Sequence, residues 1–327
     1  MKSLMLTIIV LLIIVSPVSA DEKYGVYIKV VEKVQGSFDE VSSVVEEGLK
    51  KSGWKILGSH DTGVPEKCGF RSRAIYFSSE EYAVSILKNG VNAVFALPLR
   101  AGIYEDEKGI NITIVNPPSI KRTIIDETGM DEYSLAIAKA IVETIAGSVN
   151  GDVVNEQAGQ IRKRGKIGGM GGGDFLNKID EIRSFPNSSE STLRQIAEKV
   201  KGAILRNDME WKLMYSYDLT DRGAVIYGVT KTGTEGKAFS IAGEKRVSDS
   251  NNCPGIDHVA AFPIEVVVYK EGERVRVVLM DEMYRMKLYF EDAGMWAFMK
   301  NMKMPGRIEK EIIDVVSSGL DKQDQSI

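Results

Sequence analysis

The sequence predicts an α+β protein made of two tandem two-layer units, each ordered as strand, helix, several antiparallel strands and helix. Three observations carry this prediction: two short blocks that each occur twice, amphipathic helical patterns ahead of the first block, and β-branched runs after the second. Helices kept apart from a run of antiparallel strands are typical of the α+β class.

The repeated blocks establish an internal repeat. The first begins at a tryptophan, Trp54 in copy one and Trp211 in copy two. The second covers residues 92–98 in copy one and residues 257–263 in copy two, and each ends in proline. Because the blocks recur in the same order, with offsets of nearly equal size, we interpret the chain as two copies of one unit.

An amphipathic helix is predicted before each tryptophan, since the apolar residues there recur at helical spacing. Ser37 and Ser191 are the predicted N-caps, and Glu40 completes a capping-box pattern with Ser37. The predicted apolar faces are Phe38, Val41, Val44, Val45 and Leu49 in copy one, and Leu193, Ile196, Val200 and Ile204 in copy two.

β-branched and alternating runs follow each repeated proline and predict hairpins. Polar turns at residues 106–109 and 270–272 separate the strands of these hairpins. A closing helix is predicted in each copy, at about residues 133–146 and 305–318. An antiparallel sheet with its helices on one face needs both helices to cover that face.

The stretches Leu97-Pro98…Tyr104-Glu105…Gly109 and Phe262-Pro263…Tyr269-Lys270…Gly272, with the helix and strand before each, resemble the domain of unknown function 302 family. The chain is similar to a tandem member, over about residues 24–146 and 176–318. This resemblance implies a fold like that of the TATA-binding protein, no settled activity and no catalytic residues to transfer. Copy two departs from the pattern around residues 251–255, where the family would have a helix like residues 79–87.

The predicted domains are a signal peptide at residues 1–20, a first repeat domain at 21–150, a basic and glycine-rich linker at 151–175, a second repeat domain at 176–320 and a tail at 321–327. Lys2, an apolar run from Leu4 to Val15 and small residues before Asp21 give the layout of a secretory signal peptide. We therefore expect an extracytoplasmic protein, secreted or periplasmic, that meets a membrane only through this segment if it stays uncleaved.

The net charge and the cysteine content restrict the kind of protein that the sequence can encode. The formal net charge is −4, which argues against general nucleic-acid binding. The two cysteines, Cys68 and Cys253, are candidates for a disulfide in an oxidising compartment, with two free thiols as the alternative.

The linker carries the basic residues Arg162, Lys163, Arg164 and Lys166 and six glycines between Gly165 and Gly173, including Gly168, Gly169 and Gly171. Backbone amides in such a loop could bind an anion. A flexible hinge is the favoured interpretation, because no nucleotide-binding glycine motif is present.

The two histidines, His60 and His258, lie in no metal-binding motif. The sequence Ser59-His60-Asp61 contains the three residue types of a catalytic triad. In a strand, however, His60 points to the face opposite Ser59 and Asp61, so the three side chains cannot act together. The sequence contains no G-x-S-x-G elbow. Hydrolytic catalysis is therefore not expected here.

Seven of the thirteen methionines fall between Met280 and Met304. Thioether sulfurs favour Cu(I), so a candidate metal site consists of Met283, Met295, Met299 and Met302 with Cys253 or His258. The favoured alternative makes residues 284–290 a half-buried strand and Met295, Met299 and Met302 part of an apolar helical face, with methionine as core filler or contact surface. No cofactor is predicted, and Cu(I) stays open.

Three function classes follow. The first is a non-enzymatic module that binds an unknown small ligand or protein partner on its sheet faces or in the cleft between copies. The second is an extracytoplasmic protein that handles copper or another soft metal. The third is an enzyme of unrecognised type, whose sign would be a pocket with convergent polar groups and shifted pKa values.

Overall fold

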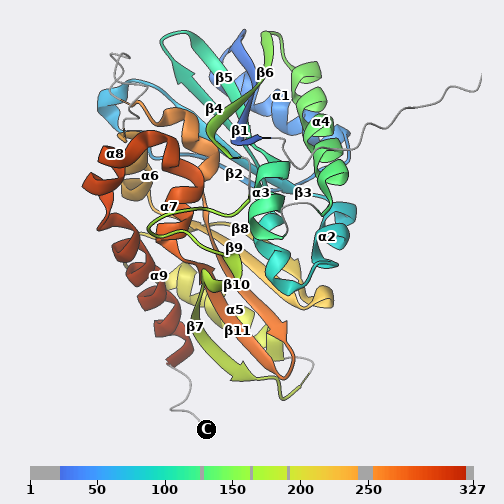
Figure 1. The fold of residues 1–327 in the computed structure, drawn as a ribbon, viewed down its shortest axis with the longest axis vertical. Coiled ribbons are helices and arrows are strands. Elements are labelled where there is room, and N and C mark those ends of the chain that lie inside the picture. The colour runs from blue at the N-terminus through green and yellow to red at the C-terminus, as the bar shows by residue number, and fades with distance from the viewer. Residues whose placement is uncertain (1–22, 126–128, 163–164, 190–191, 242–252, 322–327) are drawn as a thin grey trace, which may run out of the picture.

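The computed structural model describes residues 23–125, 129–162, 165–189, 192–241 and 253–321, and contains two antiparallel sheets with helices packed around them (Figure 1). We call residues 23–162 the N-terminal unit and residues 175–321 the C-terminal unit. The predicted α+β class is confirmed.

The N-terminal unit contains a six-stranded sheet in the order β2-β3-β4-β5-β1-β6. Its strands are β1 (Tyr24–Val34), β2 (Lys55–Asp61), β3 (Ser72–Ser78), β4 (Leu99–Asp106), β5 (Gly109–Val115) and β6 (Asp152–Arg162). Its helices are α1 (Phe38–Lys51), α2 (Glu80–Leu87), α3 (Pro117–Ile124) and α4 (Asp131–Ser148), with short 3-10 turns η1 (Glu66–Cys68) and η2 (Val91–Ala96).

The C-terminal unit contains a five-stranded sheet in the order β7-β11-β10-β9-β8. Its strands are β7 (Ile179–Pro186), β8 (Lys212–Leu219), β9 (Ala224–Thr230), β10 (Ile264–Glu271) and β11 (Arg274–Met280). Its helices are α5 (Thr192–Arg206), α6 (Thr232–Phe239), α7 (Glu282–Phe290), α8 (Gly294–Asn301) and α9 (Met304–Asp321), with 3-10 turns η3 (Phe175–Asn177), η4 (Thr220–Arg222), η6 (Ile256–Ala261) and η7 (Glu291–Ala293).

The two sheets share one strand order, because β1 to β5 occupy the places that β7 to β11 occupy in the second sheet. The repeated tryptophans stand just before β2 and β8, and the repeated prolines follow η2 and η6. The predicted capping box is present at α1, where the Ser37 side chain accepts from the backbone N–H of Glu40. Ser191 lies outside the described residues.

Three predictions about local structure are wrong. Residues 284–290 form helix α7 instead of a strand, because Asp281 caps the helix by accepting from Tyr284 N at 2.8 Å. This helix is buried on several sides, so its apolar residues satisfy both periodicities. The helix missing around residues 251–255 occurs earlier as α6, which follows β9 as α2 follows β3.

The third correction concerns the linker. Residues 152–162 form β6, which pairs antiparallel with β1 at the edge of the first sheet. The connection between units therefore begins after Arg162. Ile167 in this connection is buried and bridges Gly173, so the segment is packed on the molecule.

The units pack reciprocally. Turn η2 of the N-terminal unit contacts β9 and β10, while η6 of the C-terminal unit contacts β3, β4 and β5. One apolar core runs through both units, and a smaller core lies between the second sheet and helices α5 and α9. The central strands β4 and β10 are buried for most of their length, so the space left for a ligand lies beside the sheets.

Candidate functional site

An open cleft of about 770 Å³ lies between the two units. Strand β1, the β4–β5 turn and strand β6 form its N-terminal wall, and the segments around η6 and η7 form the opposite wall. Its acidic lining residues are Glu32, Asp106, Glu107, Glu156, Asp257, Glu291 and Asp292, against the basic residues Lys29 and Lys108. The lining therefore contains more acidic than basic residues.

Several of these carboxylates already have partners. Glu32 lies 3.5 Å from the ammonium of Lys29, and Glu291 accepts from the guanidinium of Arg162 at 2.8 Å. Glu107 and Glu156 are exposed at the cleft and extend from the β4–β5 turn and from β6. Even with Arg162 included, acidic groups outnumber basic ones, so the lining carries a net negative charge.

His258 lies directly behind this wall and is 2% exposed. Its Nε2 atom is 2.9 Å from Asp292 Oδ1, and its Nδ1 atom is 3.1 Å from Asp257 Oδ1. Burial alone would lower the pKa of His258, but the two carboxylates outweigh it and raise the pKa to about 9. The imidazole is therefore protonated at neutral pH and orients both aspartates.

The cysteines meet beside the same cleft. Cys68 of η1 and Cys253, which lines the cleft, form a disulfide with their Cα atoms 5.6 Å apart. The bond joins the N-terminal unit to the segment that leads into η6. It holds one wall of the cleft against the opposite unit.

Among the predicted anion-binding or hinge residues, Arg162 and Lys166 have partners within the protein. Arg162 donates to Glu291 and to the backbone oxygens of Lys287 and Leu288, and Lys166 lies 2.6 Å from Asp174. The Gly168 carbonyl accepts from the Lys287 ammonium, and Gly169 and Gly171 lie against α7. An anion nest presents backbone N–H groups to its ligand, whereas this loop presents a carbonyl oxygen to a cation. Lys163 and Arg164 lie outside the described residues.

A second polar cluster, which sequence reasoning missed, is buried where the units meet. Arg100 of β4 and Glu265 of β10 form an ion pair, and the Tyr215 hydroxyl donates to Glu265 at 3.2 Å. These two positions correspond in the two sheets. Arg100 is the second residue of β4 and pairs with Tyr76, the fifth residue of β3. Glu265 is the second residue of β10 and pairs with Gly228, the fifth residue of β9. The signal in the sequence was an arginine and a glutamate at matching places after the repeated prolines.

His60 belongs to this interface and to no triad. Its Nε2 atom is 2.6 Å from Glu235 of α6, and its Nδ1 atom is 2.6 Å from the Tyr76 hydroxyl. Asp61 instead accepts from Arg73 on the strand surface. The arrangement joins the units, with β2 of one held to α6 of the other.

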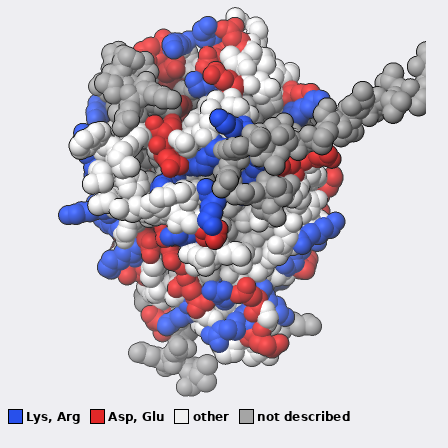
Figure 2. Space-filling view, viewed as in Figure 1, with Lys and Arg blue, Asp and Glu red and all other residues white. Residues whose placement is uncertain are grey.

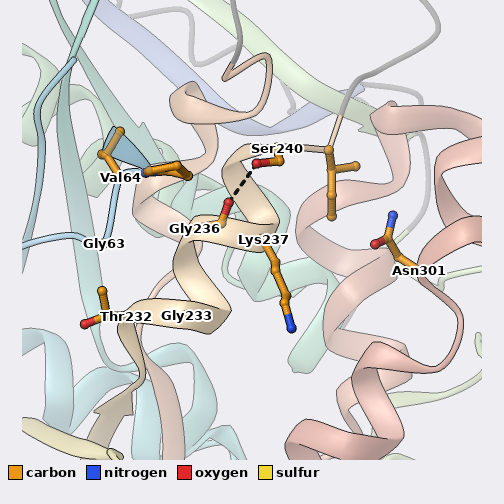
Figure 3. A pocket seen from close by; sticks show the side chains of 10 residues that line it. Gly63, Val64, Thr232, Gly233, Gly236, Lys237, Ser240 and Asn301 are labelled. Carbon is orange, nitrogen blue, oxygen red and sulfur yellow. Dashed lines mark hydrogen bonds between the residues drawn. The ribbon is translucent and has the colours of Figure 1, made fainter. Parts of the chain in front are cut away.

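A second depression of about 560 Å³ lies between the loop at Gly63 and helix α6 (Figure 3). Its lining is mostly backbone and small side chains, and the Ser240 hydroxyl donates to the Gly236 carbonyl at 3.0 Å. Lys237 is the one charged side chain among its lining residues in the described part of the chain. The acidic cleft is therefore the stronger candidate.

The structure does not bring the proposed copper ligands together. Met283 lies on α7 beside Gly171, Cys253 is in the disulfide, and His258 is held by two aspartates. Met295, Met299 and Met302 are 69%, 50% and 39% exposed, on and just after α8, so they are surface residues and not core filler. Within the described ranges, no cluster of three or more histidine, cysteine or acidic side chains is arranged to hold a metal ion.

These features define a class, an α+β protein with two antiparallel sheets and an acidic cleft between two units. Residues 30–148 match the family model described as domain of unknown function DUF302. The resemblance noted from the sequence is confirmed for the N-terminal unit.

A similar solved structure is that of an uncharacterized conserved DUF302 protein from Bacillus stearothermophilus. It is 17% identical, and the match covers 38% of this chain and 98% of that one, with a TM-score of 0.33. No curated protein matches the chain. Among the described residues, none of the helices is both long enough and apolar enough to span a bilayer.

Proposed function

We propose that this chain is a non-enzymatic binding protein built from two copies of one domain, and that it takes a cationic ligand in the cleft between them. The lining of that cleft is the observation that carries the proposal, because its seven carboxylates outnumber its two lysines and the Arg162 and His258 cations beside them. A small polyamine or a basic segment of a protein partner has the matching charge.

The duplication itself is part of this proposal. The two sheets share their strand order, and Arg100 and Glu265 occupy corresponding positions. The two walls of this cleft come from different copies of the domain, so the residues of one wall can differ in type from those of the other. Here the N-terminal wall supplies the freely exposed Glu107 and Glu156, while the C-terminal wall supplies aspartates fixed by His258.

Calorimetric titration with spermidine tests the binding site, with citrate as the anionic control. We expect spermidine to bind wild-type protein and citrate not to bind. The double variant Glu107→Gln/Glu156→Gln should bind spermidine about 10-fold more weakly, since each exposed charge contributes up to about 1 kcal/mol.

The matched control is Glu47→Gln/Glu132→Gln, which removes the same charge from exposed positions on α1 and α4. This variant should bind spermidine as wild type does. Equal losses in both double variants would mean that spermidine senses only the net charge, and would overturn the cleft as the site.

Export is also a proposal. It is supported by the layout of residues 1–20 and by the disulfide between Cys68 and Cys253, because such bonds persist in oxidising compartments. Fractionation of the native host and N-terminal sequencing of the purified protein test it. A chain that starts at Asp21 outside the cytoplasm is expected, and a cytoplasmic chain that starts at Met1 would contradict it.

Copper handling is the second candidate, and one observation keeps it open. The thioethers of Met295, Met299 and Met302 are all exposed, at a spacing that places them on one helical face. Titration with Cu(I) against a competing chelator should show binding that is lost when these three residues become leucine. A wild-type protein that ignores Cu(I) would exclude this candidate.

A further inference from the structure

Helix α8 exposes large apolar side chains at its surface. None of its residues is buried. Trp296 is 74% exposed, whereas Trp54 and Trp211 are 8% and 3% exposed, and Met295 is 69% exposed. Together with Met299 and Met302 these residues form what we call the α8 face. Exposing a tryptophan and three methionines to water costs free energy unless a partner covers them.

Basic residues flank this face. Lys300 near the end of α8, Lys303 in the turn before α9 and Arg307 in the first turn of α9 are all exposed. Residues 294–308 contain these three basic residues and no acidic one, although the whole chain has a net charge of −4. In Figure 2 the region of α8 is a largely uncharged patch with Lys and Arg side chains at its outer rim. The positive charge is therefore local to the α8 face.

The combination selects one kind of partner. A helix that lies in a bilayer interface presents tryptophan and other apolar residues on one side and lysine or arginine beside them. Tryptophan favours the headgroup region because its ring has an apolar body and a polar N–H. Anionic headgroups supply the charge that pairs with the basic rim, at about 1 kcal/mol for each lysine or arginine near the surface.

We propose that the α8 face docks the protein on an anionic lipid surface, with Met295, Trp296, Met299 and Met302 inserted among the headgroups. Lys300, Lys303 and Arg307 contact lipid phosphates from the rim. The contact is peripheral and reversible, because one short helix buries a small apolar area. It leaves the acidic cleft free, since that cleft takes only Gly294 from α8.

Sedimentation with vesicles of phosphatidylcholine and phosphatidylglycerol tests the proposal on the full chain. Wild type should bind vesicles with 30% phosphatidylglycerol, bind pure phosphatidylcholine at least about 10-fold more weakly, and lose binding as salt rises. Emission from Trp296 should shift to shorter wavelength on binding, and the shift should vanish in Trp296→Phe.

Two variants separate the two contributions. Met295→Ser/Trp296→Ser/Met299→Ser should lose binding, and Lys300→Glu/Lys303→Glu should weaken it about 10-fold or more and reduce its salt dependence. Because these side chains are exposed, the variants should unfold at the wild-type temperature. The control Leu176→Ser/Leu205→Ser removes two other apolar side chains, 64% and 62% exposed, and should bind like wild type.

The leucine variant Met295→Leu/Met299→Leu/Met302→Leu distinguishes lipid from metal, because it keeps the apolar surface and removes the sulfur. It should still bind vesicles. Failure of wild type to bind anionic vesicles, equal binding to neutral ones, or unchanged binding by the serine variant would each overturn the proposal. A concentration-dependent dimer that the serine variant abolishes, without any vesicle binding, would assign the face to a second copy instead.

Discussion

At the residue scale, the buried His258 side chain holds two of the aspartates that line the cleft. His258 lies between Asp257 and Asp292, and these carboxylates hold its pKa at about 9 against an ordinary value of 6.5. A group whose pKa is raised by folding stabilises the protein fully below its unfolded pKa. That stabilisation is lost as pH rises through the folded pKa. The window here is from about pH 6.5 to about pH 9.

We predict that Asp292→Asn lowers the pKa of His258 and removes part of this stability. The shift from 6.5 to about 9 corresponds to a contribution on the order of 3 kcal/mol, which two carboxylates share. The variant should therefore lose about 1 to 2 kcal/mol at pH 6 and show a smaller difference from wild type near pH 10. Urea unfolding across this range measures the effect.

Proton NMR provides the control, because the chain has only two histidines and His60→Gln leaves the signal of His258 alone. An unchanged pKa of His258 in Asp292→Asn, or a stability difference that grows with pH, would contradict the assignment. Buried Glu282, whose pKa burial raises to about 8, is present in wild type and variant alike and cancels in the comparison.

His258 also shows what the sequence could and could not predict. The sequence places it inside a repeated block, but its partner Asp292 is 34 residues away and lies in a turn that follows an unrecognised helix. The pairing of Cys68 with Cys253 is the one disulfide that the sequence allows, because it contains two cysteines, although two free thiols are equally consistent with it. The acidic cleft, in contrast, gathers residues from five separate segments, and no local pattern brings these together.

At the element scale, the interface between β4 and β10 depends on one buried ion pair. Arg100 and Glu265 are 2% and 3% exposed, and Arg100 also donates to the Ala261 carbonyl at 3.0 Å. In two identical copies the corresponding positions would carry the same charge and repel each other. The difference between the copies allows opposite charges to meet.

We predict that Arg100→Met or Glu265→Leu alone destabilises the protein by about 3 to 5 kcal/mol, because each leaves an unpaired buried charge. The double variant should recover most of this loss, since two apolar side chains need no counter-charge. A chemical unfolding series on the four proteins gives the coupling energy. Additive losses would show that the pair contributes nothing to the interface.

Elements with local signals were predicted well, and those defined by contacts between units were not. The capping box at Ser37, the repeated tryptophans and the two hairpins follow from neighbouring residues. The sequence gives no sign of strand β6, because its residues are mostly polar and do not alternate with apolar ones. It forms a strand because it pairs with the edge of β1. The alternation of residues 284–290 favours a strand, but these residues form helix α7, which is buried on more than one side.

At the scale of the whole molecule, the two units form one body with a shared core, and the disulfide from Cys68 to Cys253 joins them across 185 residues of chain. Such a bond restricts the unfolded chain more as the loop lengthens. We predict that Cys68→Ser/Cys253→Ser loses about 2 to 5 kcal/mol. Thermal unfolding with and without reductant measures this loss.

Reduced wild type should melt at the temperature of the double serine variant, and the variant should not respond to reductant. Reductant that leaves the wild-type melting temperature unchanged would show that the disulfide does not stabilise the folded units.

The central claim is that a cation binds between the two units, and hydrogen–deuterium exchange with and without spermidine tests it most directly. Protection should appear on both walls of the cleft, at the β4–β5 turn and at residues 253–258, because backbone there lines or adjoins the site. Protection confined to one unit, or centred on the groove at Gly63 and Gly236, would contradict the account.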